Sequence, residues 1–139
     1  MRYFLLISLA LVSTMALPAE KSPIAVVVSE QSPIQEMDKA DIAAIFMGQL
    51  ASLTSAHSLT PLDSEENELR EMFYQLLLGR SNNQMRAYWA RMVFVGQGKP
   101  PPQIKRDNLK NKIPGPPPAI SYVPADEVGI GLRVIYVLR

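Results

Sequence analysis

The side chains best suited to catalysis or metal binding are scarce in this sequence of 139 residues. His57 is the only histidine and there is no cysteine, so a zinc site would need carboxylates alone beside one imidazole. Serine, histidine and acids are all present, but no serine lies in the strand–turn–helix elbow that exposes a nucleophile. We therefore expect no catalytic residue, no metal and no cofactor, and a protein that is not an enzyme.

The segment at residues 96–99 has the composition of part of a phosphate-binding loop. Such a loop needs the pattern G-x-x-x-x-G-K-[ST] between a strand and a helix, so that backbone amides face the phosphates. Here Lys99 is followed by three prolines, which lack backbone N–H groups. The segment therefore does not predict a nucleotide site.

Two segments are rich in charge of one sign. Residues 63–71 hold five acids, and residues 105–112 hold four basic residues. Both are typical of solvated helix faces, where acids near the N-terminus are favoured by the helix dipole. The alternative is a polar docking surface, or a head-to-tail contact between copies of the chain.

The composition is that of an ordinary globular chain with almost no net charge. Hydrophobic residues make up 47% and charged residues 19%, and the formal net charge is +1. If Arg2 is removed with an N-terminal segment, the number of basic residues falls from 14 to 13. It then equals the 13 acidic residues, so the net charge is zero. Because a neutral chain has no overall attraction for nucleic acid or anionic lipid, we expect no nucleic-acid partner.

Residues 1–19 have the pattern of a signal peptide. Arg2 precedes an apolar run over residues 4–12, and small residues follow, with cleavage expected after Ala16 or Ala19. An uncleaved anchor is the less favoured alternative, because a membrane-spanning helix needs about 20 apolar residues. We expect no stable membrane insertion, a periplasmic location, and a single domain formed by residues 20–139.

Apolar spacing predicts alternating strands and helices. The run at residues 24–28 is β-branched and apolar on both faces, which is typical of a strand buried on both sides. Asp38 is placed to cap a short helix that ends at Gly48. Further strands are expected at residues 59–62, with Pro61 at an edge or end, and at residues 119–123 and 132–138, and a loop over residues 49–58.

Two amphipathic helices are expected in the middle of the chain. Ser64 or Asn67 can cap the first, which Gly79 ends. Ser81 caps the second, so the two helices are expected to fold back as a pair. A short helix capped by Asp107 should follow. The apolar face of the second helix is expected in the core, with a ligand pocket as the alternative; it comprises Met85, Tyr88, Trp89, Met92 and Val93.

Four motifs occur in a recognisable order. The strand at residues 24–28 is followed by Ser32-Pro33, and Asp41-Ile42-Ala43-Ala44-Ile45-Phe46-Met47-Gly48 resembles the pattern q-l-x-x-I-F-x-G. Arg70-x-x-Phe73 resembles an R-x-x-F helix start, and Ala119-Ile120-Ser121-Tyr122-Val123 resembles an a-I-G-Y-v strand. Together they resemble the phosphate-binding periplasmic proteins of ABC importers, and the short exported proteins that match one lobe of them.

The resemblance implies an α/β fold that is a single lobe of a type 2 periplasmic-binding protein, with a small mixed sheet flanked by three to four helices. In the family, the first and last of these strands are hinge crossings between two lobes. The strand at residues 24–28 and the strand that ends the chain would then be exposed hinge strands. Such strands could pair with a protein partner, or form a homo-oligomer, by β-augmentation.

The resemblance also locates a phosphate site, and the sequence departs from the family there. The family uses an arginine and a Ser-Gly-Thr run before its R-x-x-F helix; counting back from Arg70, those positions hold Asp63, Asn67, Glu68 and Leu69. A carboxylate at 4 Å repels a unit negative charge by about 4 kcal/mol at an effective dielectric constant of 20. We therefore expect no tight phosphate binding by this chain alone.

A ligand, if one binds, is expected where the loop at residues 29–32 meets the helix start at residues 63–70. The predicted function is an exported, non-enzymatic binding or interaction module. Two alternatives stay open: a structural accessory subunit of a cell-envelope assembly that binds a protein partner, and a genuine binder of a small anion such as phosphate. The candidate ligand-binding residues are Ser29, Ser32, Ser64, Asn67 and Arg70.

Overall fold

The computed structural model describes residues 22–49 and 59–139. The elements are β1 (Ile24–Ser29), α1 (Lys39–Phe46), β2 (Thr60–Pro61), β3 (Asp63–Ser64), α2 (Asn67–Leu78), α3 (Asn82–Phe94), β4 (Gln103–Ile104), α4 (Arg106–Lys112), β5 (Ala119–Pro124), the 3-10 turn η2 (Ala125–Glu127) and β6 (Leu132–Leu138). The expected signal peptide, His57 and nearly all of the loop expected at residues 49–58 lie outside the described residues.

Four strands form a mixed sheet in the order β2-β5-β1-β6. β1 is antiparallel to both β5 and β6, and β2 is parallel to β5. Ile24, Val26 and Val28 pack on the side of α1 and α2, whereas Ala25 and Val27 pack on the side of α4. The predicted strand with two buried faces is therefore confirmed.

β1 is a central strand, so the expectation that it is exposed at a hinge is wrong. Because β5 and β6 pair with its two edges, β1 has no edge left for another chain. Of the two expected hinge strands, only β6 lies at an edge of the sheet, where Val134 and Val137 are each 37% exposed. The opposite edge is the short strand β2, which contains Pro61 as predicted.

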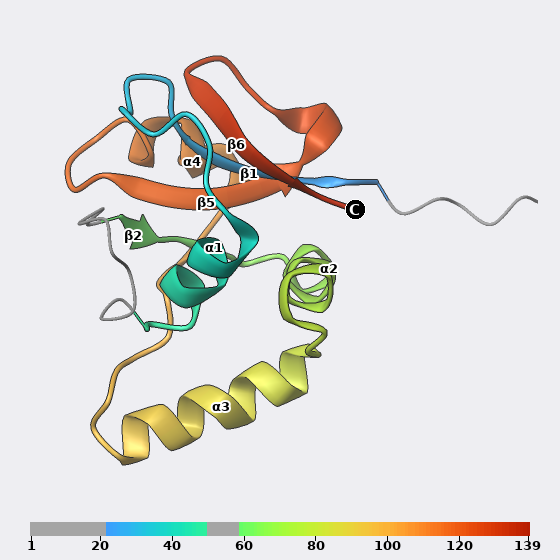
Figure 1. Cartoon of the computed structure of the whole chain (residues 1–139), viewed down its shortest axis with the longest axis vertical. Coiled ribbons are helices and arrows are strands. Elements are labelled where there is room, and N and C mark those ends of the chain that lie inside the picture. Colours follow the sequence, from blue (N-terminus) through green and yellow to red (C-terminus); the bar gives the residue numbers. More distant parts are fainter. Residues whose placement is uncertain (1–21, 50–58) are drawn as a thin grey trace, which may run out of the picture.

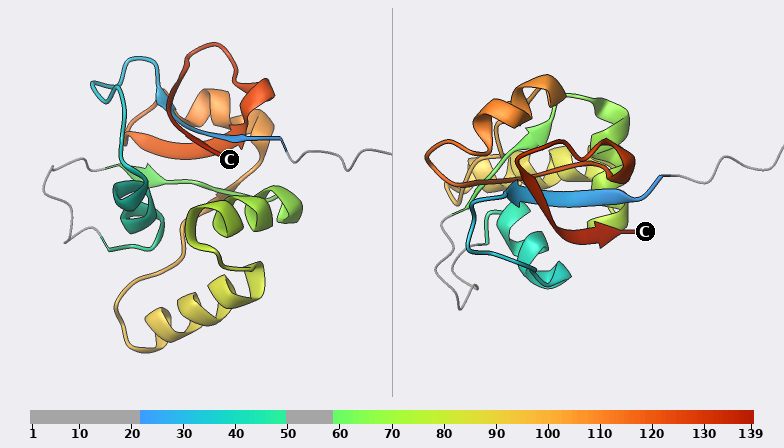
Figure 2. Two further views of the ribbon diagram at one scale, coloured as in Figure 1. Left: turned by 45° about the vertical axis from the view of Figure 1, so that its right-hand side comes forward. Right: turned by 90° about the horizontal axis from the view of Figure 1, so that it is seen from above.

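The helices form layers on the two faces of the sheet. Figure 1 shows α1 and α2 on one side of the sheet and α4 on the other, with α3 farthest from the sheet, and Figure 2 gives two further views of this arrangement. Phe73 of α2 stacks on Tyr122 of β5 with ring centroids 3.6 Å apart, and Phe46 of α1 meets Phe73 edge-on at 4.8 Å. These rings join three elements in one core.

The boundary between α2 and α3 follows the predicted residues. Gly79 ends α2 in the left-handed conformation with φ of 66°. Ser81 begins α3 with a capping box, in which its Oγ accepts from the Gln84 N–H at 3.2 Å and Gln84 Oε1 accepts from the Ser81 N–H at 2.8 Å. The two helices cross instead of lying side by side, since Figure 1 shows α2 end-on and α3 along its length.

α3 also rests against the end of α1, which explains the crossing. Asp38 is at the N-cap position of α1 as predicted, but its side chain makes no capping hydrogen bond. The chain turns after the helix at Gly48, where φ is +69°, as predicted. A Cβ atom at Gly48 would lie 3.2 Å from the indole of Trp89. Tyr88 Oη donates a hydrogen bond to the Met47 carbonyl at 2.8 Å. Tyr88 and Trp89 therefore pack α3 against the C-terminal end of α1.

Two of the predicted helix caps are wrong. The N-cap of α2 is Glu66, because Ser64 is held in β3 and its Oγ accepts from the Glu66 N–H at 3.0 Å instead. Asn67 is the first residue of the helix and not its cap. The N-cap of α4 is Lys105, so Asp107 lies inside the first turn, where its charge still suits the helix dipole.

Candidate functional site

Asp63 carries the only charged side chain that is buried in the described part of the chain, at 5% exposure. Its Oδ2 accepts a hydrogen bond from Tyr74 Oη at 3.0 Å. Its Oδ1 accepts from Tyr122 Oη and from the Ser64 N–H, the latter at 2.9 Å. Asp63, Tyr74 and Tyr122, from β3, α2 and β5, form what we call the Asp63 cluster.

Burial sets the protonation behaviour of this cluster. Burial raises the pKa of Asp63 above its ordinary value of 3.8, against the hydrogen bonds and the charge of Arg70, which lower it. The pKa values of Tyr74 and Tyr122 are raised by burial first and by the neighbouring carboxylate second. Both tyrosine hydroxyls therefore stay protonated and act as hydrogen-bond donors to the carboxylate.

Arg70 lies beside the cluster, and its guanidinium makes hydrogen bonds to residues at the starts of α2 and α3. Its Nη1 donates to the Ser64 carbonyl at 3.0 Å, its Nη2 donates to Asn67 Oδ1, and its Nε donates to Asn82 Oδ1 at 3.4 Å. Asn82 Nδ2 donates to the Asn67 carbonyl at 3.0 Å. The guanidinium thus links the start of α2 to the start of α3.

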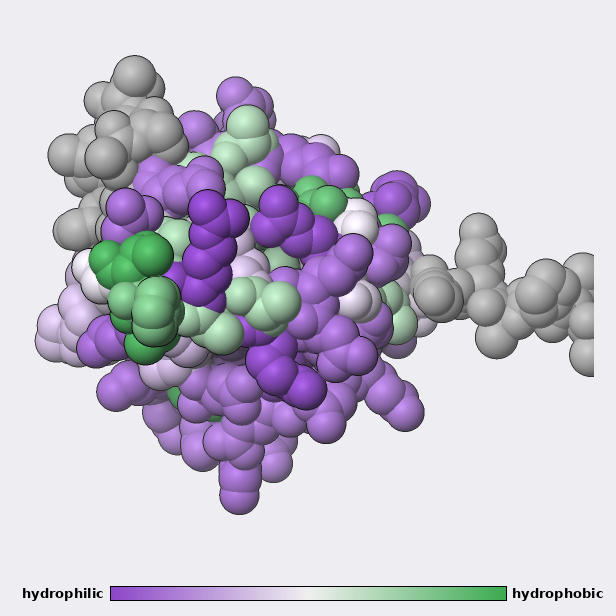
Figure 3. All heavy atoms as spheres, turned by 90° about the horizontal axis from the view of Figure 1, so that it is seen from below, coloured by the Kyte–Doolittle hydropathy of each residue, from purple (hydrophilic) through white to green (hydrophobic). Residues whose placement is uncertain are grey.

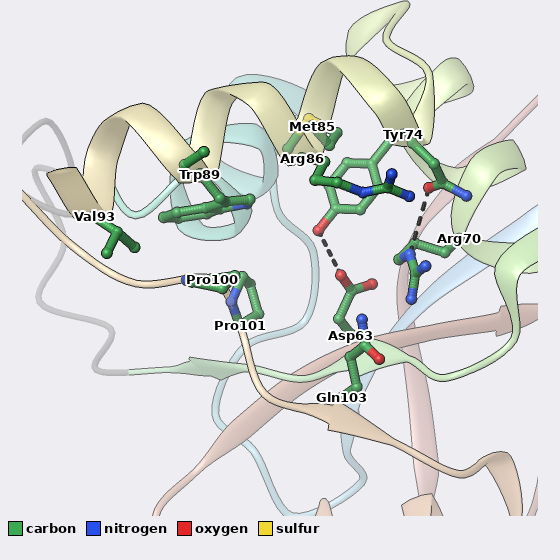
Figure 4. Close-up of a pocket in the computed structure, with 12 residues that line it drawn as sticks. Asp63, Arg70, Tyr74, Met85, Arg86, Trp89, Val93, Pro100, Pro101 and Gln103 are labelled. Atoms are coloured by element: carbon green, nitrogen blue, oxygen red, sulfur yellow. Dashed lines mark hydrogen bonds between the residues drawn. The ribbon is translucent and has the colours of Figure 1, made fainter.

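A groove with a volume of about 540 Å³ runs between α3 and the segment at residues 100–103, and we call it the α3 groove. Figure 4 shows Trp89 and Val93 on one wall, with Pro100 and Pro101 facing them. The other end is polar and contains the cluster carboxylate. Further lining residues are Arg70, Tyr74, Asn82, Met85, Arg86, Ala90 and Gln103. One end of the groove is therefore apolar and the other is charged.

The five predicted ligand-binding residues do not form one site. Ser64, Asn67 and Arg70 lie together at the start of α2. Ser29 and Ser32 line a different hollow, of about 330 Å³, together with the segment at residues 113–119. The hydroxyls of these two serines accept hydrogen bonds from the backbone N–H groups of Gln31 and Ile34.

The expected convergence of the two segments is wrong because of strand direction. The loop at residues 29–32 and the helix start at residues 63–70 could meet only if β1 and β2 ended at the same end of the sheet. β2 is instead parallel to β5, which is antiparallel to β1. The chain leaves β1 at one end of the sheet and leaves β2 toward the other.

Sequence reasoning missed most of the residues that shape this region. Tyr74 and Tyr122 occupy positions of apolar patterns, and only their need for a hydroxyl partner when buried could have drawn attention to them. The two-residue parallel pair of β3 and β4, which sets Asp63 beside Gln103, was not predicted. Strands this short carry no periodic signal.

The two charged segments are connected to each other. Arg106 of α4 forms ion pairs with Glu66, which caps α2, and with Glu127 of η2. All three side chains are partly exposed, so these pairs contribute little to stability individually. The predicted solvated faces thus meet at one point of the surface.

Within residues 22–49 and 59–139, there is no group of three or more histidine or acidic residues arranged to hold a metal ion. The same part of the chain has no helix that is both long enough and apolar enough to span a bilayer.

The chain has an α/β fold, with a mixed sheet between helical layers, and this fold is like one lobe of a periplasmic-binding protein. Among solved structures, the chain is similar to a protein from Clostridium perfringens that is assigned as a phosphate ABC transporter substrate-binding protein and was crystallised with bound phosphate. The TM-score is 0.57 and the sequence identity 14%, over 82% of this chain and 45% of that one. This chain therefore spans less than half of the neighbour's length. No protein-family model and no curated protein matches the sequence.

Proposed function

We propose that this chain is an exported, non-enzymatic binding module, built on one lobe of a substrate-binding fold, that does not bind inorganic phosphate tightly. The observation that carries the proposal is the buried carboxylate of Asp63 at the position where the family resemblance implies an arginine. A carboxylate there repels an oxyanion, where the guanidinium would attract it.

The neighbouring groups add to this argument. Arg70, whose positive charge acts on Asp63, is already hydrogen-bonded to Ser64, Asn67 and Asn82. Glu68 adds a further negative charge in the first turn of α2. The oxygens of a bound phosphate would accept hydrogen bonds from backbone N–H groups in this turn. At the start of α2, phosphate would therefore be repelled by two carboxylates, and the arginine there is already hydrogen-bonded within the protein.

Isothermal titration of the purified chain with sodium phosphate tests this proposal. We expect no saturable heat with phosphate up to millimolar concentration. The Asp63→Asn variant is the matched control, since it removes the charge and keeps the shape of the side chain. A micromolar dissociation constant in the unmodified chain would contradict the proposal and favour the small-anion alternative.

The export part of the proposal rests on the pattern of residues 1–19. It is tested by the mass of the protein recovered from the periplasmic fraction of an expressing Gram-negative cell. A chain that begins at Leu17 or Glu20 is the expected product. Recovery of the uncleaved chain in the cytosol would contradict it.

A second candidate function is a structural accessory subunit of a cell-envelope assembly. It is supported by β6, which pairs with β1 as its only strand partner in the described part of the chain, accepts a hydrogen bond from the Met37 N–H at the Ile135 carbonyl, and exposes Val134 and Val137. An edge of this kind can accept a strand from another chain by β-augmentation.

The absence of native cysteine allows this second candidate to be tested cleanly. A photo-crosslinker attached at Val134→Cys should give a defined crosslinked product in envelope preparations, whereas the same label at Arg91→Cys on α3 should not. Equal products from both positions, or none from Val134→Cys, would remove support for the edge strand as an interface.

A further inference from the structure

The α3 groove combines an apolar chamber with a cation that has no partner in the described part of the chain. Arg86 lines the groove and is exposed, and no hydrogen bond or ion pair holds it within residues 22–49 and 59–139. It differs in this respect from Arg70, whose three nitrogens are all engaged. A free guanidinium at the edge of an apolar hollow favours an anionic group.

The charged side chains that line the groove also have a net positive charge, which favours an anionic ligand. Two arginines, Arg70 and Arg86, and one carboxylate, Asp63, line the groove. The Asp63 oxygens already accept hydrogen bonds from two tyrosine hydroxyls and one backbone N–H. The groove lining therefore has one positive charge in excess, and Arg86, the cation without a partner in the described residues, is the group that can pair with a single negative charge.

The apolar end defines the rest of the ligand. Trp89 is largely buried, at 8% exposure, and borders the groove with its indole, whereas Val93 on the next turn of α3 is 55% exposed. Pro100 and Pro101 form the opposite wall and offer no backbone N–H. The volume of about 540 Å³ is within the range of small-molecule sites, which is roughly 300–1,000 Å³.

We propose that the α3 groove binds a small organic monoanion with an apolar body, whose carboxylate pairs with Arg86 while its hydrocarbon part lies between Trp89 and Pro101. The inference rests on the proposed function, because it names a ligand class for the binding module. The polar end of the groove adjoins the start of α2, where the resemblance implies phosphate binding, whereas its apolar end lies along α3.

Trp89 makes the test direct, since it is the only tryptophan in the sequence and lies in the groove. The probe is octanoate, with octanamide as the uncharged analogue of the same length and inorganic phosphate as the control without a hydrocarbon part. We expect octanoate to change the Trp89 emission saturably, octanamide to bind more weakly, and phosphate to leave the emission unchanged.

Two variants locate the carboxylate. Arg86→Gln should weaken octanoate binding by about tenfold, the loss expected for one hydrogen bond to a charged group, and change octanamide binding less than twofold. Arg91→Gln is the matched control, because Arg91 is exposed on the same helix and does not line the groove. Thermal melting should be unchanged in both, since neither side chain has a hydrogen-bond or ion-pair partner to lose among residues 22–49 and 59–139.

Each outcome is decisive. A saturable octanoate response that Arg86→Gln weakens selectively supports the inference. No saturable response, equal affinity for octanoate and octanamide, or an unchanged affinity in Arg86→Gln overturns it. Failure with octanoate together with silence toward phosphate overturns only the ligand class, whereas saturable phosphate binding overturns the proposed function.

Discussion

In the Asp63 cluster a carboxylate is 5% exposed, whereas at the C-terminal end of α3 the ring of Phe94 is 91% exposed. The first region places a charge in the core, and the second places apolar side chains in water, where Val93 and Val95 lie beside Phe94. Figure 3 views the molecule from the α3 side and shows small apolar areas within a mainly hydrophilic surface.

The two regions differ in what holds them. Asp63 is fixed by hydrogen bonds from α2 and β5, which are far apart in the sequence. The end of α3 is fixed by its own helix, which starts at a local capping box and is anchored through Tyr88 and Trp89. The buried charge therefore depends on contacts between distant segments, whereas the exposed apolar tip depends on the formation of α3 and its anchoring to the end of α1.

The largest effect is expected where the buried hydrogen bonds are removed. Asp63→Ala leaves the hydroxyls of Tyr74 and Tyr122 without their acceptor inside the core. We expect the free energy of unfolding to fall by about 3 kcal/mol, as for other changes that leave buried polar groups unsatisfied. Urea denaturation measures it, and a loss below about 1 kcal/mol would mean that the cluster is not a stabilising unit.

A smaller effect is expected from pH. Because burial raises the folded-state pKa of Asp63 above 3.8, the folded state favours the protonated acid. Its contribution to stability is fully present below pH 3.8 and is lost as the pH rises through the folded-state pKa. Asp63→Asn should abolish this part of the pH profile, so the stability of the unmodified chain relative to the variant should decrease with rising pH. Parallel profiles would contradict the assignment.

In the second region, the capping box can be broken without touching the core. Ser81→Ala removes the acceptor for the Gln84 N–H and should lower the free energy of unfolding by about 1 kcal/mol. Hydrogen exchange should locate the change in the first turn of α3 and leave β1 amides unaffected. Ser81→Asp, which retains an acceptor, is the control and should restore most of the stability.

The smallest effect is expected at the apolar tip. Phe94→Ser replaces a ring that is already in water, so stability should change by less than about 0.5 kcal/mol. Chemical denaturation beside the unmodified chain measures this. A loss above about 1 kcal/mol would show that Phe94 packs against the protein in solution, and the contrast between the two regions would then disappear.

Most of the fold could be predicted because its signals are local. The β-branched run of β1, the glycines after α1 and α2, and Ser81 before α3 each act within a few residues. The candidate site could be predicted only in part. Ser64, Asn67 and Arg70 do lie together, but Ser29 and Ser32 lie elsewhere, since their position depends on the direction of strands that pair across 90 residues or more.

The sequence by itself determined the segments that form the helices and the strands β1, β2, β5 and β6, that β1 is buried on both faces, and that an acid stands before α2. The tertiary structure decided that this acid is enclosed by Tyr74 and Tyr122, that β1 is central while β6 is at an edge, and that α3 forms a groove with Pro100 and Pro101. The reason is physical: apolar periodicity and helix capping act between neighbours in the chain, whereas strand order and the partners of a buried carboxylate are fixed only when distant segments pack.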